Sequence, residues 1–272
     1  MFSWLYVFIG LLILVGTICQ GTIGFGLGTI ATPILALIKP ELVPTLILLL
    51  AFVISTTTML KSRSAVSWDI VAISSIARIP GSLLGAWAIA SLSHRGLSLF
   101  IGCAVIFAMT LSSLGWSPKR TTTNIAVAGV ASGFLGTSTS IGGPPMALVM
   151  KGYDPARIRG TLSGTFIIGC AISLAILALS GQITSLQLTT AAAYLPVAIV
   201  GLIAAGYLNR FINATVLNRI VIVVAISAAV ALIVEGLVAA KRPRPTARTT
   251  LHTARSAKVL ASDPRSVNNF VN

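Results

Sequence analysis

Long apolar runs, each close to the length of a membrane-spanning helix, dominate this chain of 272 residues. A helix needs roughly 20 mainly apolar residues to cross about 30 Å of hydrocarbon. Such runs lie at about residues 2–20, 42–60, 69–92, 97–115, 160–180, 186–208 and 214–240. Runs such as NRIVIVVAISAAVALIV do not alternate in polarity, as the strands of a transmembrane barrel would. The sequence therefore predicts an all-α protein that crosses a lipid bilayer several times.

The composition and the placement of charge agree with this class. Hydrophobic residues make up 56% of the chain and charged residues 9%, with a net charge of +14. Seven of the 19 basic residues lie in 241–272, and nearly all the others lie between apolar runs, as the positive-inside bias requires. We therefore expect no nucleic-acid partner. We expect the polar tail 241–272 to be disordered, with contact to anionic lipid as an alternative role.

Two segments rich in glycine and proline, 21–39 and 123–151, are also apolar and have similar sequences. They contain the sequences GTIGFGLGTIATP and SGFLGTSTSIGGPP. A shift of the chain by 112 residues pairs Gly21 with Gly133, Gly24 with Gly136 and Pro33 with Pro145. Further along the chain, a shift by 116 residues pairs Pro80 with Pro196 and Gly85 with Gly201. These matches predict two homologous halves of four segments each, 1–115 and 123–240, joined by a connector at 116–122.

The segment from Thr121 to Lys151 has 31 residues, too many for one straight crossing. We expect a helix over 121–135, unwound chain over 136–143 and a second helix from Pro144 to Lys151, because proline is tolerated in the first turn of a helix. This segment would dip into the membrane and return as a re-entrant hairpin. Pro33 would begin the matching half-helix of the first half.

The basic residues favour this arrangement. If both segments re-enter, the halves are inverted and nine Lys or Arg residues lie on one side against two on the other. A simple eight-helix topology, which splits them four against seven, remains the alternative.

A helix that begins at mid-membrane presents free N–H groups and a partial positive charge, which bind anions. Glycine lets the backbone approach a ligand, and Ser or Thr can add hydroxyl donors. The expected anion-binding residues of the first half are Gly21, Gly24, Gly28, Thr29, Thr32 and Pro33. Those of the second half are Gly136, Thr137, Ser138, Thr139, Ser140, Gly142, Gly143, Pro144 and Pro145. Close helix packing is the alternative reason for the glycines.

Arg78 adds a full charge to this list. It lies near the middle of the run 69–92, and a charge at that depth is costly and suggests a function. We expect it to contact the anion. An arginine that extends its charged group to the membrane surface is the alternative.

Other site chemistry has little support in the sequence. Cys19, Cys103 and Cys170 lie inside apolar runs without CxxC spacing, and His94 and His252 belong to no ligand-like cluster. The Gly-rich segments lack the Gly-Lys-Ser/Thr of a nucleotide-binding loop. We therefore expect neither a metal centre nor another cofactor, and no enzyme active site.

The order of these motifs resembles the TauE/SafE sulfite exporter family over about residues 5–240. In each half a Gly-rich stretch precedes Pro, and a later helix has Pro-x4-Gly, in PGSLLGAWAIASL and PVAIVGLIAAGYL. The first half departs from the second in having Ile30-Ala31-Thr32 in place of Gly142-Gly143-Pro144. The resemblance implies a multi-pass permease of the bacterial inner membrane that exports small sulfur-containing or organic anions, such as sulfite or sulfoacetate. An anion channel and a non-transporting membrane scaffold remain the alternatives.

Overall fold

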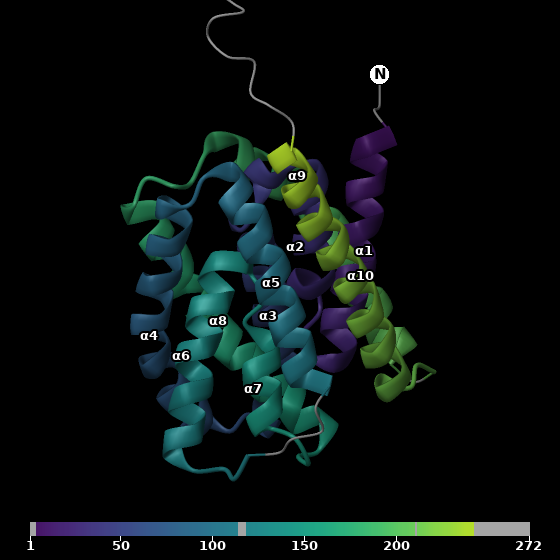
Figure 1. Ribbon diagram of the computed structural model, residues 1–272. Helices are drawn as coiled ribbons and strands as arrows, with labels where there is room; N and C mark the ends of the chain where they lie inside the picture. Colours follow the sequence, from purple (N-terminus) through teal and green to yellow (C-terminus); the bar gives the residue numbers. More distant parts are fainter. Residues whose placement is uncertain (1–3, 114–117, 210, 242–272) are drawn as a thin grey trace, which may run out of the picture. The chain divides into compact units, whose positions relative to one another are not determined.

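The computed structural model describes residues 4–113, 118–209 and 211–241, and the regular structure within them is helical (Figure 1). Short 3₁₀ turns at Pro40–Leu42 and Arg63–Ala65 accompany the α-helices. The α-helices of the described residues are α1 (Trp4–Ile23), α2 (Leu27–Ile38), α3 (Thr45–Lys61), α4 (Trp68–Ser91), α5 (His94–Ser113), α6 (Thr122–Thr139), α7 (Gly143–Val149), α8 (Pro155–Leu179), α9 (Ser185–Leu208) and α10 (Ala214–Lys241).

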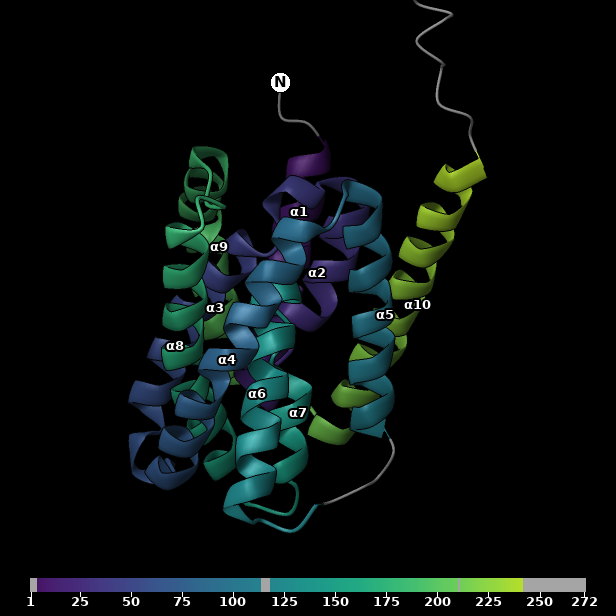
Figure 2. The same cartoon turned by 60° about the vertical axis from the view of Figure 1, so that its left-hand side comes forward.

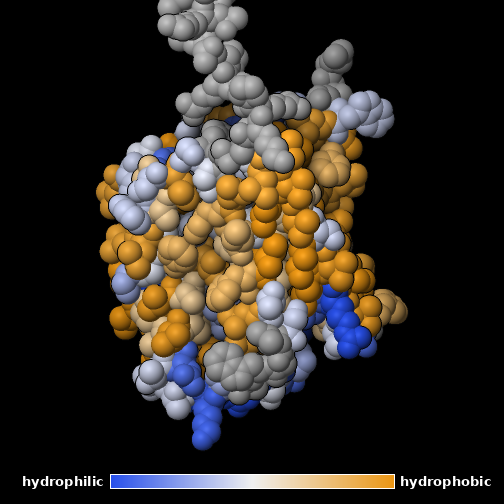
Figure 3. All heavy atoms as spheres, in the orientation of Figure 1, coloured by the Kyte–Doolittle hydropathy of each residue, from blue (hydrophilic) through white to orange (hydrophobic). Residues whose placement is uncertain are grey.

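Six of these helices, α1, α4, α5, α8, α9 and α10, are long and apolar enough to cross a membrane. The run expected at 42–60 forms α3, whose 17 residues are near the lower limit for a span. Large apolar side chains such as Trp87 and Leu179 are exposed on the outer helices, and apolar atoms cover the middle of the face in Figure 3. The prediction of an all-α, multi-pass membrane protein is confirmed.

Polar residues at the helix starts fix several of these boundaries. The hydroxyl of Thr121 accepts a hydrogen bond from the backbone N–H of Asn124 at the start of α6, and the carboxylate of Asp154 accepts one from Ala156 at the start of α8. Thr184 and Gln187 form a capping box at the start of α9. Each cap satisfies a backbone donor that the helix itself leaves unpaired.

The connections α3–α4, α5–α6, α7–α8 and α9–α10 lie at the lower end in Figures 1 and 2. Arg157 Nε donates to Ser67 Oγ at 2.6 Å, and Arg120 Nη2 donates to the carbonyl of Lys151 at 2.8 Å. We call this the basic end, because these connections and the helix ends beside them carry eight described basic residues: Lys61, Arg63, Lys119, Arg120, Lys151, Arg157, Arg159 and Arg219. Arg210, the ninth predicted there, lies outside the described residues.

Two breaks interrupt the helical chain and meet inside the bundle. The first break, Gly24–Gly26, separates α1 from α2, and the second break, Ser140–Gly142, separates α6 from α7. Gly24 (φ 89°) and Gly26 (φ 147°) have backbone conformations that favour glycine. A Cβ on Gly28, in the first turn of α2, would collide with the carbonyl oxygen of Ser140, so the chain directly after the first break lies against the second break.

The boundaries at the second break differ from the prediction of unwound chain over 136–143. Helix α6 continues to Thr139, and the hydroxyls of Ser138 and Thr139 donate to carbonyls one turn back in the same helix. Helix α7 begins at Gly143 with Pro144 in its first turn, within one residue of the predicted start.

The expected start of a half-helix at Pro33 is wrong. Helix α2 already begins at Leu27, after the positive-φ glycine Gly26, and Pro33 lies inside it. Proline has no N–H, so the carbonyl of Thr29 loses its usual partner one turn later.

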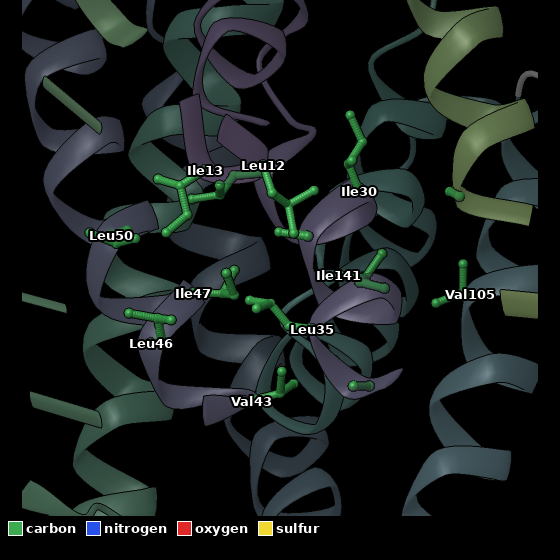
Figure 4. Close-up of a cluster of buried hydrophobic side chains, with 14 of the residues drawn as sticks. Leu12, Ile13, Ile30, Leu35, Val43, Leu46, Ile47, Leu50, Val105 and Ile141 are labelled. Atoms are coloured by element: carbon green, nitrogen blue, oxygen red, sulfur yellow. The ribbon is translucent and has the colours of Figure 1, made fainter. Parts of the chain in front are cut away.

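The helices of residues 1–115 pack against those of residues 122–236. The most extensive packing joins α4 to α6, α3 to α8 and α1 to α9. Ile141 of the second break lies among apolar side chains of α1, α2 and α3 (Figure 4). Residues 1–236 therefore form one compact unit.

The remaining residues, 237–272, form a separate unit, of which the structure describes only the end of α10 at 237–241. The tail expected to be disordered lies outside the described residues from 242 onward. Residues 114–117, which include the start of the expected connector 116–122, also lie outside the described residues.

Candidate functional site

A small cavity of about 30 Å³ lies where the two breaks meet. This is room for about two water molecules. The residues around it come from α1, α2, α3, α4, α6, α7, α8 and both breaks. They are Gln20, Phe25, Gly26, Gly28, Thr29, Leu48, Ala51, Arg78, Gly136, Ser140, Ile141, Gly142, Gly143, Phe166 and Cys170.

Arg78 of α4 brings a buried positive charge to this cavity. Its side chain is 2% exposed, its Nη1 donates to Ser132 Oγ at 3.0 Å, and its Nε has no hydrogen-bond partner. Ser132 Oγ in turn donates to the carbonyl of Gly142 in the second break at 2.7 Å. None of the described residues that line the cavity is Asp or Glu. A buried charge without an opposite charge beside it is costly, so this guanidinium is suited to receive an anion.

Glycines leave the space that the guanidinium occupies. A Cβ on Gly136 would collide with Nη2 of Arg78, and one on Gly169 would lie 2.5 Å from Nη1 and 2.7 Å from Nε. A Cβ on Gly142 would lie 3.4 Å from Nη1. Larger residues at Gly136 or Gly169 would displace the charged group.

The start of α2 adds backbone donors. The N-cap residue Gly26 provides no side-chain hydrogen bond, and the first backbone bond of the helix runs from Ile30 N to Gly26 O at 3.0 Å. The N–H groups of Leu27, Gly28 and Thr29 therefore have no partner within the helix, and Gly28 and Thr29 line the cavity. The prolines of α7 have no N–H, so its first turn offers fewer donors than that of α2.

A family model described as "Sulfite exporter TauE/SafE" matches residues 8–232, which include both breaks and Arg78. The chain belongs to the TauE/SafE family. It is therefore a multi-pass membrane protein of a sulfite-type exporter family, as the order of its motifs suggested. Comparisons with curated proteins and with solved structures find no match.

The four Ser and Thr side chains of 137–140, which were expected to bind the anion, have other partners in this TauE/SafE protein. Thr137 Oγ1 and Ser173 Oγ lie 2.7 Å apart, and Ser138 and Thr139 donate within α6. Ser140 does line the cavity, but its hydroxyl donates to the carbonyl of Pro44 at 2.9 Å. Of the two threonines expected in the first half, Thr29 lines the cavity, and Thr32 Oγ1 is buried without a hydrogen-bond partner outside it.

The residues expected to bind the anion divide into two groups, those that line the cavity and those that do not. Gly28, Thr29, Arg78, Gly136, Ser140, Gly142 and Gly143 line the cavity. Gly21, Gly24, Thr32, Pro33, Thr137, Ser138, Thr139, Pro144 and Pro145 are not among its lining residues. Gly21 packs against α9, where a Cβ would lie 2.7 Å from that of Ala205, so close helix packing explains this glycine.

Several residues that line the cavity or contact Arg78 were not expected from the sequence. Gln20 is a polar residue in an otherwise apolar run, and Phe25 stands between two glycines; both patterns were visible signals. Ser132, Phe166, Gly169 and Cys170 gave no comparable signal, because their role depends on where α6 and α8 pack against α4.

Proposed function

We propose that this protein exports small sulfur-containing or organic anions, such as sulfite or sulfoacetate, across the inner membrane of a bacterial cell. The buried guanidinium of Arg78 carries the proposal, because it has an unpaired Nε and no carboxylate beside it in the cavity. Entry of an anion would neutralise a charge that the apolar bundle otherwise holds at a cost.

The geometry favours an oxyanion. A guanidinium binds two oxygens of one anionic group through parallel hydrogen bonds, and sulfite or a sulfonate offers three oxygens. The unpaired N–H groups at the start of α2 and the hydroxyl of Thr29 would serve the remaining oxygen. A cavity of about 30 Å³ suits a single small group in a closed state of the transporter.

We also propose that the two broken segments are re-entrant hairpins of an inverted repeat. Both stretches have the same order: a long helix, a break, a short helix and three longer helices. Gly85 and Gly201, which the sequence pairs, have similar surroundings. A Cβ on Gly85 would meet the carbonyl of Phe134 and the Cβ of Thr137, and one on Gly201 would meet the carbonyl of Leu14 and the Cβ of Thr17.

This repeat supports transport by a carrier. Carriers with inverted repeats place their substrate sites near mid-membrane, where discontinuous helices of the two repeats meet. The contact between Gly28 and Ser140 joins the two breaks in that way. The basic end would face the cytoplasm.

The thermal stability of the purified protein in the presence of anions tests the proposal. A ligand of the folded state raises the unfolding midpoint with its concentration. We expect sulfite or sulfoacetate to raise the midpoint of the wild type and to have no effect on Arg78→Gln. The variant Arg63→Gln, which changes an exposed arginine of the α3–α4 connection, should respond like the wild type. A response of Arg78→Gln equal to that of the wild type would remove the basis of the proposal.

A further inference from the structure

A second and larger cavity, of about 350 Å³, lies at the basic end. We call it the vestibule. Lys151 and Arg159 are among the residues that line it, together with polar residues of α10 such as Thr215 and Asn218. None of its described lining residues is Asp or Glu. The positive charges of Lys151 and Arg159 raise the local concentration of anions in this cavity.

Phe25 lines both the vestibule and the Arg78 cavity. Its side chain is 8% exposed and belongs to an apolar cluster with Met146, Leu162 and Phe166. The side chain packs closely on the first residue of α7, because a Cβ on Gly143 would lie 2.6 Å from Phe25 Cβ and 2.9 Å from its Cγ. An apolar ring thus lies between a basic entrance and a buried arginine.

The backbone around Phe25 has the freedom that a moving part needs. Gly24 and Gly26 flank it, both with positive φ, and the three residues belong to no helix. Gly24 also contacts the vestibule side, since a Cβ there would lie 3.4 Å from the Cα of Arg159. A small rotation about these glycines would swing the ring without unwinding α1 or α2.

We propose that the vestibule is a loading site for the substrate anion and that Phe25 is the gate between it and Arg78. Lys151 and Arg159 collect the anion at the basic end, and outward rotation of Phe25 admits it to the cavity. This inference rests on the proposed function, because it assumes that Arg78 receives the anion.

Access to Cys170 tests the gate without a transport assay. This thiol lines the Arg78 cavity but not the vestibule. The reagent 2-sulfonatoethyl methanethiosulfonate is a membrane-impermeant organic sulfonate that forms a mixed disulfide with thiols. Its rate of reaction with Cys170 can be followed by mass spectrometry in inverted membrane vesicles, where the cytoplasmic side, and with it the basic end, meets the reagent. We expect Phe25→Ala to raise this rate about tenfold or more, as a barrier lowered by about 1.4 kcal/mol would.

Met146→Ala is the matched control. Met146 is buried in the same apolar cluster as Phe25, but it lines neither the Arg78 cavity nor the vestibule. Its truncation should leave the rate from the basic end near that of the wild type. An unchanged rate in Phe25→Ala, or an equal rise in Met146→Ala, would overturn the gate. If Phe25→Ala does not fold, Phe25→Leu replaces it and should give a smaller rise over the wild type.

The charge of the vestibule has its own test. In the Phe25→Ala background, Arg159→Gln should reduce the rate of Cys170 labelling by the anionic reagent relative to its cationic trimethylammonium analogue. The reduction should shrink as salt is added, because salt screens exposed charges. A ratio of rates unaffected by Arg159→Gln would contradict the loading site. Labelling of Cys170 reports access to the cavity, whereas thermal stabilisation reports anion binding at Arg78. If the labelling tests fail, the gate is overturned but the proposed anion site is not. If the stabilisation is lost, the proposed anion site is overturned, and the labelling rates do not change.

Discussion

Arg78 occupies its position because glycines of α6, α8 and the second break leave room for it. Gly136 and Gly142 lie beside its terminal nitrogens, Gly169 of α8 lies beside Nη1 and Nε, and Ser132 holds Nη1 by a hydrogen bond. The sequence predicted the arginine, since a lone charge in an apolar run is conspicuous. It could not predict Gly169, because only the packing of α8 on α4 brings that glycine to the guanidinium.

The variant Gly169→Ala tests this arrangement at the residue scale. The new methyl group would displace the guanidinium, which is the flexible end of a long side chain and can move at moderate cost. We expect anion-induced stabilisation to be lost, with a destabilisation of the free protein at the low end of about 1–3 kcal/mol. Thermal unfolding with and without sulfite measures both effects.

Gly133→Ala is the comparison for this variant. A Cβ there would collide with the backbone carbonyl of Arg78 and lie 3.0 Å from Ser82 N, and backbone atoms cannot move aside as a side chain can. We expect Gly133→Ala to destabilise the protein more than Gly169→Ala does. If Gly169→Ala binds anion as the wild type does, the position of the guanidinium is not what determines binding.

At the scale of the elements, the two broken segments were only partly predictable. Pro144 and Pro145 predicted the start of α7 well, because proline is tolerated in the first turn of a helix and is costly in its interior. Pro33 misled in the first half, because the positive-φ glycine Gly26 ends the break earlier and the helix accommodates the proline inside. The sequence also did not predict the side-chain hydrogen bonds of Ser138 and Thr139 within α6, because they form only if the helix continues to Thr139.

The contact between the breaks leads to a prediction about Gly28. In Gly28→Ala the new methyl group would collide with the carbonyl oxygen of Ser140, so the breaks would have to separate. We expect a destabilisation of about 1–3 kcal/mol or more in thermal unfolding. Gly206→Ala in α9 is the control, since no heavy atom lies within 4 Å of its added Cβ. It should leave the stability unchanged or raise it by up to about 1 kcal/mol. Equal effects of the two substitutions would argue against a tight contact between the breaks.

At the scale of the whole molecule, the distribution of charge suggests how export is driven. None of the described residues that line the Arg78 cavity is a carboxylate, so the site has no evident proton carrier. Moving one negative charge out of a cell that is negative inside releases roughly 2.3 kcal/mol per 100 mV. The membrane potential alone is then sufficient to drive export of an anion.

Flux in proteoliposomes of defined orientation tests this uniport. We expect efflux of sulfite from the side of the basic end to accelerate when that side is made negative and to slow when the potential is reversed. A pH gradient imposed at constant potential should have little effect. A flux that ignores the sign of the potential but follows the pH gradient would instead require a coupled proton.

Counterflow of labelled anion in proteoliposomes tests the central claim, that Arg78 binds the transported anion at the junction of the two breaks. Liposomes loaded with unlabelled sulfite should accumulate labelled sulfite transiently when they contain the wild type or Arg63→Gln, as a carrier does and a channel does not. Liposomes with Arg78→Gln, folded to the same extent, should accumulate none. Accumulation by Arg78→Gln at the wild-type rate would contradict the account.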